Sequence, residues 1–155
     1  MSRTRAPANA AAQHRAERVR DEMFAKDRAT RWLGMQVVEV APGSATLAME
    51  VRAEMLNGHD ICHGGLIATL ADSAFAFACN SYNELSVASS FAADFFAPAR
   101  LGDRLTARCL EVSKTGRNGL YDAEVTNQRG ERIAVFRGRS YTIKGQPLVD
   151  EETQA

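Results

Sequence analysis

One long helix, predicted over Gly64–Asn80, constrains the fold of this chain more than any other feature. Apolar residues such as Leu66, Leu70 and Phe77 recur on most sides of this segment. A helix that is apolar all round is buried all round. It is not a membrane span, because Asp72 interrupts it short of the roughly 18 apolar residues that a span needs. We therefore expect the rest of the chain to enclose a helix roughly 25 Å long.

Strand patterns occupy most of the remaining chain. Short segments rich in β-branched residues are separated by turn compositions such as 42–44 and 127–130. Because these connections are short, we expect a mainly antiparallel sheet. A curved antiparallel sheet around one long helix is the hotdog architecture, of the α+β class. The predicted strands are 35–40, 45–51, 86–97, 104–112, 120–126 and 132–143.

Length and composition predict a single domain. With 155 residues and 45% hydrophobic content, the chain can bury one full-sized core. We predict a flexible N-terminal tail over 1–9, one hotdog domain over 10–145 and a flexible acidic tail over 146–155. The domain includes a peripheral amphipathic helix over 10–32, which Gly34 is placed to end. The Arg-rich start also has the bias of a transit peptide, but a frayed tail is the favoured interpretation.

Charge and cysteine content exclude several classes of function. Basic and acidic residues both number 19, so the net charge is zero. Broad nucleic-acid binding would need a net basic face. The three cysteines, Cys62, Cys79 and Cys109, are odd in number and lack the paired spacing of a metal site. They fit a reducing compartment, and we expect a cytoplasmic protein that binds neither nucleic acid nor a membrane.

The start of the long helix carries groups suited to acyl chemistry. Gly64 and Gly65 open the helix, where free backbone N–H groups and the helix dipole can stabilise an oxyanion. Asp72 lies within the helix, where aspartate is an unfavourable residue and is rarely buried without a partner. It can act as a base or nucleophile, although a structural acid bonded to a backbone group remains the alternative.

These residues belong to segments that resemble the hotdog acyl-CoA thioesterases, most closely the phenylacetate-degradation group. The likeness extends over about 32–143, and the combined spacing of the Asn, His-Gly-Gly and Asp motifs is specific. It implies hydrolysis of an aryl-acyl thioester of coenzyme A, such as hydroxyphenylacetyl-CoA, without a metal or other cofactor. The segments that carry the likeness are Leu56-Asn57-Gly58-His59, Cys62-His63-Gly64-Gly65, Leu70 to Asn80 and Phe136-Arg137-Gly138.

The resemblance also assigns roles to individual residues. It gives Gly64 the backbone N–H that binds the thioester carbonyl, Gly65 a supporting position and Asp72 the role of the buried acid. The preceding polar residues correspond to Asn57, which could hold the water or the thioester, and His63, which could orient the loop through its ring. The family further implies a hotdog homodimer with shared sites, often paired into a homotetramer.

Helix geometry independently points to a shared site. Gly64 and Asp72 are eight residues apart, or roughly 12 Å along a helix axis, too far for both to touch one carbonyl carbon. If they act together, Asp72 of one protomer must face Gly64 of another, and a two-fold axis then creates two sites per dimer.

Several other residues are candidates for supporting roles. Some hotdog thioesterases position water with a hydroxyl on the strand after the helix; Ser89 and Ser90 point to opposite faces, so at most one fits. The loop residues His59, Cys62 and His63 could instead form a metal cluster, a less favoured interpretation. The candidate contacts to CoA phosphates are Arg100, Lys114, Arg117, Arg137 and Arg139. The aromatic residues expected mainly in the core are Phe75, Phe77, Phe91, Phe95 and Phe96.

Two points stay open at this level. Asp72 could activate water as a general base or attack the thioester to form a mixed anhydride. A hotdog hydratase or dehydratase, with His63 and Asp72 as a proton-transfer pair, and a non-catalytic acyl-CoA-binding protein are the alternative functions. The lack of a DNA-binding segment weighs against the second alternative, a protein that binds acyl-CoA as a sensor.

Overall fold

The computed structural model describes residues 9–152 and has the predicted order of two strands, a long helix and four strands. An N-terminal pair of helices, α1 (Ala10–Lys26) and α2 (Arg28–Trp32), precedes them. The long helix is α3 (Gly64–Asn80), preceded by a short 3-10 turn, η1 (Ala53–Met55). No helix within residues 9–152 is long and apolar enough to cross a membrane. The strands are β1 (Gln36–Ala41), β2 (Ser44–Glu50), β3 (Ser86–Phe95), β4 (Arg104–Thr115), β5 (Asn118–Thr126) and β6 (Arg132–Thr142).

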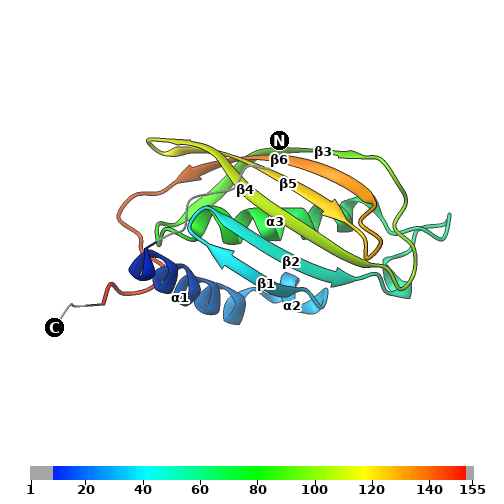
Figure 1. Cartoon of the computed structure of the whole chain (residues 1–155), viewed down its shortest axis with the longest axis horizontal. Coiled ribbons are helices and arrows are strands. Elements are labelled where there is room, and N and C mark those ends of the chain that lie inside the picture. The colour runs from blue at the N-terminus through cyan, green and yellow to red at the C-terminus, as the bar shows by residue number, and fades with distance from the viewer. Residues whose placement is uncertain (1–8, 153–155) are drawn as a thin grey trace.

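The six strands form one antiparallel sheet in the order β1-β2-β4-β5-β6-β3. Three of the neighbouring pairs are hairpins joined by short turns, as the sequence predicted. The sheet curves over α3, and α1 lies along β1 (Figure 1). This arrangement confirms the α+β hotdog fold. It also leaves β1 and β3 as the two edge strands.

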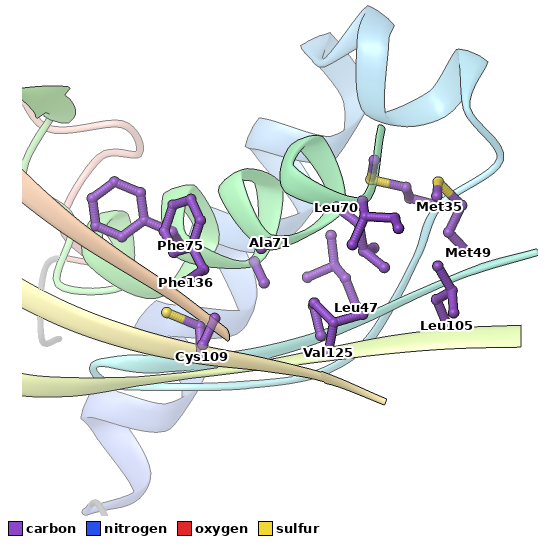
Figure 2. Close-up of a cluster of buried hydrophobic side chains, with 14 of the residues drawn as sticks. Met35, Leu47, Met49, Leu70, Ala71, Phe75, Leu105, Cys109, Val125 and Phe136 are labelled. Atoms are coloured by element: carbon purple, nitrogen blue, oxygen red, sulfur yellow. The ribbon is translucent and has the colours of Figure 1, made fainter. Parts of the chain in front are cut away.

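The core lies between α3 and the concave face of the sheet. Leu70 and Ala71 of α3 point toward Leu47 of β2 and Val125 of β5 (Figure 2). Along β5 and the first half of β4, buried side chains alternate with more exposed ones, which is the period expected of a strand with one face covered. In β2 the alternation is interrupted, because Leu47, Ala48 and Met49 are all buried.

The helix α3 is not enclosed on every side, which corrects the sequence-based expectation. Gly65, Thr69, Asp72 and Ala76 are each partly or fully exposed. They are spaced three or four residues apart and so share one helix face. The sheet covers one side of α3 only, and in a single chain this open face contacts solvent.

Three of the five phenylalanines assigned to the core are exposed. Phe75 and Phe77 are buried, whereas Phe91, Phe95 and Phe96 are 51%, 50% and 61% exposed. The last two of these lie at or just beyond the end of β3, and Phe91 lies within it. Because β3 is an edge strand with no strand beyond it, the fold provides no neighbour to cover these rings fully.

The predicted single helix over 10–32 is interrupted at Asp27. Its carboxylate accepts hydrogen bonds from the backbone N–H of Thr30 at 3.0 Å and from the Thr30 hydroxyl at 2.7 Å. Asp27 is therefore the N-cap of α2, and the chain turns there. Gly34 adopts a φ of 71° and follows α2 as predicted.

Gly138 permits close packing between β6 and α3. A Cβ at this position would lie 2.9 Å from the ring of Phe136 and 3.1 Å from the ring of Phe75. A larger residue would force these rings apart. The need for close packing explains why a glycine stands here in the middle of β6.

The ends of the described chain differ from simple tails. Of the predicted N-terminal tail, residues 1–8 lie outside the described residues, as do 153–155 of the C-terminal tail. Residues 148 and 149 donate backbone hydrogen bonds to the Asn83 side chain, both within 2.9 Å. Arg18 of α1 bonds the backbone carbonyl of Asp150 at 2.9 Å. The first part of the acidic segment thus contacts the domain, and its flexibility stays a prediction.

Candidate active site

Two backbone N–H groups are free at the start of α3. The carbonyl of His63, the N-cap residue, accepts hydrogen bonds from the N–H groups of Leu66 and Ile67. Among residues 9–152, no hydrogen bond uses the N–H of Gly64 or Gly65. With the positive end of the helix dipole behind them, these amides can bind an oxyanion.

Asp72 lies eight residues further along the same helix. It is half-buried on the open face, and no hydrogen bond or ion pair within residues 9–152 holds its carboxylate. The alternative of a structural acid bonded to a backbone group therefore has no support in the described chain. Burial raises the pKa of Asp72, and the negative charge of Asp27 raises it further. A carboxylate whose pKa is raised is a better proton acceptor than one that is fully exposed to solvent.

Asn57 organises the loop that leads to α3. Its side-chain oxygen accepts hydrogen bonds from the backbone N–H of His59 at 2.9 Å and of Ile61 at 3.4 Å. The oxygen is therefore committed to the loop. The amide N–H₂ of Asn57 has no partner within residues 9–152, so it remains available as a donor to a substrate or water.

His63 acts here through its backbone. Its N–H donates to the carbonyl of Met55 at 2.9 Å, and its carbonyl caps α3. Its ring is exposed and makes no hydrogen bond within the described residues, in contrast to the predicted role for the ring nitrogens in orienting the loop.

No group of three or more His, Cys, Asp or Glu in residues 9–152 is arranged to hold a metal ion. Burial raises the pKa of Cys62 to about 11, so it is a neutral thiol.

The structure separates the two candidate serines. A β-bulge between Ala88 and Ser90 leaves Ser89 unpaired, and its hydroxyl bonds the carbonyl of Arg139 at 3.2 Å. Ser90 shares the alternation of Ala92 and Asp94, which line the face of the sheet away from α3. Ser90 therefore faces away from α3, whereas alternation does not fix the face of Ser89, which lies in the bulge.

The five basic candidates lie in three places. Arg100 is exposed and next to Ala99, whose carbonyl accepts the N–H of Cys62 just before α3. Lys114 and Arg117 lie at the β4–β5 hairpin, far from the start of α3. Lys114 forms an ion pair with Glu84 and lies over the ring of Tyr82. Arg117 donates a hydrogen bond to the Tyr141 hydroxyl.

Arg137 and Arg139 occupy exposed positions two residues apart on β6, on its outward face. Arg137 forms a bidentate ion pair with Asp122, with Nε donating to Oδ1 at 2.7 Å and Nη2 donating to Oδ2 at 2.8 Å. It lines a groove of about 940 Å³ on the outer side of the sheet. Neither Gly64 nor Asp72 lines this groove. Of the five candidates, Arg100 alone lies near the free amides within one chain.

Sequence reasoning missed two residues at the site. A Cβ on Gly64 would lie 3.2 Å from the ring of Phe95, so this half-exposed ring lies against the start of α3. Asp27, far away in sequence, contributes its charge to the surroundings of Asp72. The Asp-x-x-Thr pattern of Asp27 and Thr30 is a helix N-cap signal that could have located the helix break, but no sequence signal links it to Asp72.

Comparison with known proteins agrees with this geometry. Residues 59–134 match the Thioesterase superfamily. The chain is also 41% identical over 132 residues to the acyl-coenzyme A thioesterase PaaI of Escherichia coli, covering 85% of this chain and 94% of that protein. The chain belongs to the hotdog thioesterases of the PaaI group. Membership confirms the family and the thioesterase class that the sequence predicted.

Solved structures of PaaI-group thioesterases share the fold closely. The E. coli PaaI protein, from the phenylacetic acid degradation operon, superimposes with a TM-score of 0.85 at 40% identity, covering 87% of this chain and 98% of that one. A PaaI variant from Thermus thermophilus gives 0.73 at 40% identity, with coverage of 76% and 100%.

Proposed function

We propose that this thioesterase hydrolyses aryl-acyl thioesters of coenzyme A, such as hydroxyphenylacetyl-CoA, to the free acid and coenzyme A. The main support is the pairing of two free amides at the start of α3 with an unpartnered, half-buried carboxylate on its open face. The similarity to an acyl-coenzyme A thioesterase suggests the substrate class.

The proposed reaction begins with the thioester carbonyl at the Gly64 N–H, aided by Gly65 and the helix dipole. Asp72 takes a proton from water as the water oxygen bonds to the carbonyl carbon, and the amides stabilise the resulting oxyanion. The C–S bond then breaks and the proton passes to the thiolate. In the alternative route, Asp72 itself attacks and water hydrolyses the mixed anhydride. Either route needs only groups of the protein and the substrate.

We propose that two protomers complete each site. Eight residues of continuous helix separate Gly64 from Asp72 by roughly 12 Å, so one chain cannot bring both to one carbonyl. The start of α3 lies against the ring of Phe95, at the end of the edge strand β3. The rings of Phe91 and Phe95 expose apolar surface there, as expected where a second copy packs.

Further assembly and location follow as proposals from the same reasoning. We propose that dimers pair into a homotetramer, and that the protein works in the cytoplasm. The three cysteines are free and buried within the described chain, which suits a reducing compartment.

Supporting roles go to three residues around the site. The free amide N–H₂ of Asn57 would hold water or the thioester, and the Ser89 hydroxyl would position water. Arg100 is the preferred contact for a CoA phosphate, since it is exposed beside the loop that leads to α3.

The experiment that tests the proposed activity measures thiol release from a panel of aryl and straight-chain acyl-CoA thioesters. We expect free coenzyme A to appear, fastest with arylacetyl-CoA thioesters. A change in enoyl absorbance without thiol release would identify a hydratase or dehydratase instead. Ligand binding without any product would identify a non-catalytic acyl-CoA-binding protein.

A mixing experiment tests the shared site. Neither Gly64→Pro, which lacks the amide donor, nor Asp72→Asn, which lacks the acid, is expected to be active alone. When both variants are co-expressed, random pairing should place an intact Gly64 opposite an intact Asp72 in about one quarter of sites, restoring about that share of activity. If both groups of a site came from the same chain, the mixture would stay inactive.

A further inference from the structure

A buried chain of hydrogen bonds connects the N-terminal helices to the turn of α3 that carries Asp72. The Thr30 hydroxyl donates to the Asp27 carboxylate at 2.7 Å and lies 2.9 Å from the Ser73 hydroxyl. Thr30 is 1% exposed and Ser73 is 8% exposed. Because the Thr30 proton is already given to Asp27, Ser73 must be the donor to Thr30. The chain therefore runs from Ser73 through Thr30 and ends on a negative charge.

These hydrogen bonds link Asp27 to the residue that follows Asp72, the proposed acid of the site. Ser73 follows Asp72 in α3, so the chain holds α2 against the same helical turn. In addition to burial, the negative charge of Asp27 raises the pKa of Asp72.

The other titratable groups near the pair contribute less. Cys79, on α3, interacts with Asp72 but is a neutral thiol, because burial raises its pKa to about 12. Lys114 of β4 acts on Cys79. The cations around Asp27, those of Lys26, Arg28 and Arg31, are exposed to solvent.

We propose that Asp27 is a positioning residue for catalysis, which acts on Asp72 through its charge and through the Thr30–Ser73 contact. This inference rests on the proposed role of Asp72 as the reacting acid. The N-terminal helices then have a role beyond covering the sheet. They bring a second carboxylate to the reacting one from a distant part of the sequence.

A purely structural role for Asp27 makes a different prediction. Asparagine and serine cap helices about as well as aspartate, so the N-cap itself needs no negative charge. Replacing the charge while keeping a capping residue therefore separates the two roles.

The test is the pH profile of kcat/KM for thioester hydrolysis. In Asp27→Asn, loss of the negative charge lowers the pKa of Asp72, so the low-pH limb should move to lower pH. Asp27→Ser, a second uncharged cap, should move it in the same direction. Asp27→Glu keeps the charge and should restore the limb toward its original position. The matched control is Asp21→Asn, which removes an exposed negative charge from α1.

A ¹³C NMR titration of the Asp72 carboxyl provides the same comparison without turnover. Equal low-pH limbs and equal carboxyl titrations in Asp27→Asn, Asp27→Ser and Asp21→Asn would overturn the inference. That failure is distinguishable from failure of the proposed function. If Asp72→Asn is inactive while the Asp27 variants titrate unchanged, Asp72 keeps its role and Asp27 loses its own; if Asp72→Asn is fully active, the proposed chemistry itself is wrong.

Discussion

Asp72→Asn is expected to lower kcat/KM for thioester hydrolysis by at least about a hundredfold, the lower range for a positioned acid or base. The substitution keeps the size and shape of the side chain but removes its ability to accept a proton or attack a carbonyl. Since no hydrogen bond within residues 9–152 depends on the carboxylate, the local structure should be preserved. Initial rates of thiol release at matched enzyme concentrations measure the loss.

Thermal unfolding provides the control for this variant. The folded-state pKa of Asp72 is raised, so the stability associated with this group is fully present below its unfolded pKa and is lost as pH rises through the folded pKa. Near neutral pH the ionised carboxylate is therefore unfavourable, and Asp72→Asn should have a higher Tm than the unaltered protein. The difference should shrink under acidic conditions.

A matched substitution on the other side of the sheet completes the design. Asp94 is exposed on β3 and lines the outer groove, so Asp94→Asn should leave turnover nearly unchanged. Full activity of Asp72→Asn, or equal losses in both variants, would exclude Asp72 as the reacting acid.

Gly64→Pro is expected to lower kcat by about 10² to 10³, or roughly 2.7–4 kcal/mol of transition-state stabilisation. Proline removes one backbone N–H, the proposed oxyanion donor. It suits the first position of a helix, where no intrahelical partner exists for that N–H. His63, the preceding residue, has a ψ of 131°, which is the extended value that a residue before proline prefers rather than a helical one. The backbone should therefore tolerate the change.

Gly64→Ala is the matched control for the proline variant. Both substitutions add a Cβ that lies 3.2 Å from the ring of Phe95, but alanine keeps the N–H. The half-exposed ring has room to move, so the alanine variant should retain most of its kcat. Equal rates for the alanine and proline variants would show that the Gly64 amide does not stabilise the transition state.

Local patterns predicted the secondary structure well because turns and alternation are properties of short segments. The bounds of α3 agree with the prediction to the residue, and the strands differ by at most three residues at an end. The main miss was the break at Asp27, where an N-cap inside a helical pattern starts a second helix. Here the hydrogen bonds to Thr30 outweigh the continuity of the apolar spacing.

Side-chain environments were harder to predict, because they depend on which face a neighbour covers. Phe91 and Phe95 have the composition of core residues, yet they lie on an edge strand with no neighbour beyond it. Alternation alone could not choose between Ser89 and Ser90, since a bulge at Ser89 shifts the register of β3.

The sequence by itself determined the fold class, the family and the residues most suited to the chemistry, because helical periodicity, turn composition and the motif around Gly64 and Asp72 are all local. Tertiary structure decided how those residues are surrounded. The open face of α3 and the effect of the Asp27 charge on Asp72 both depend on packing between segments far apart in the chain. No local pattern encodes such contacts, because each arises only when the sheet, α2 and α3 come together.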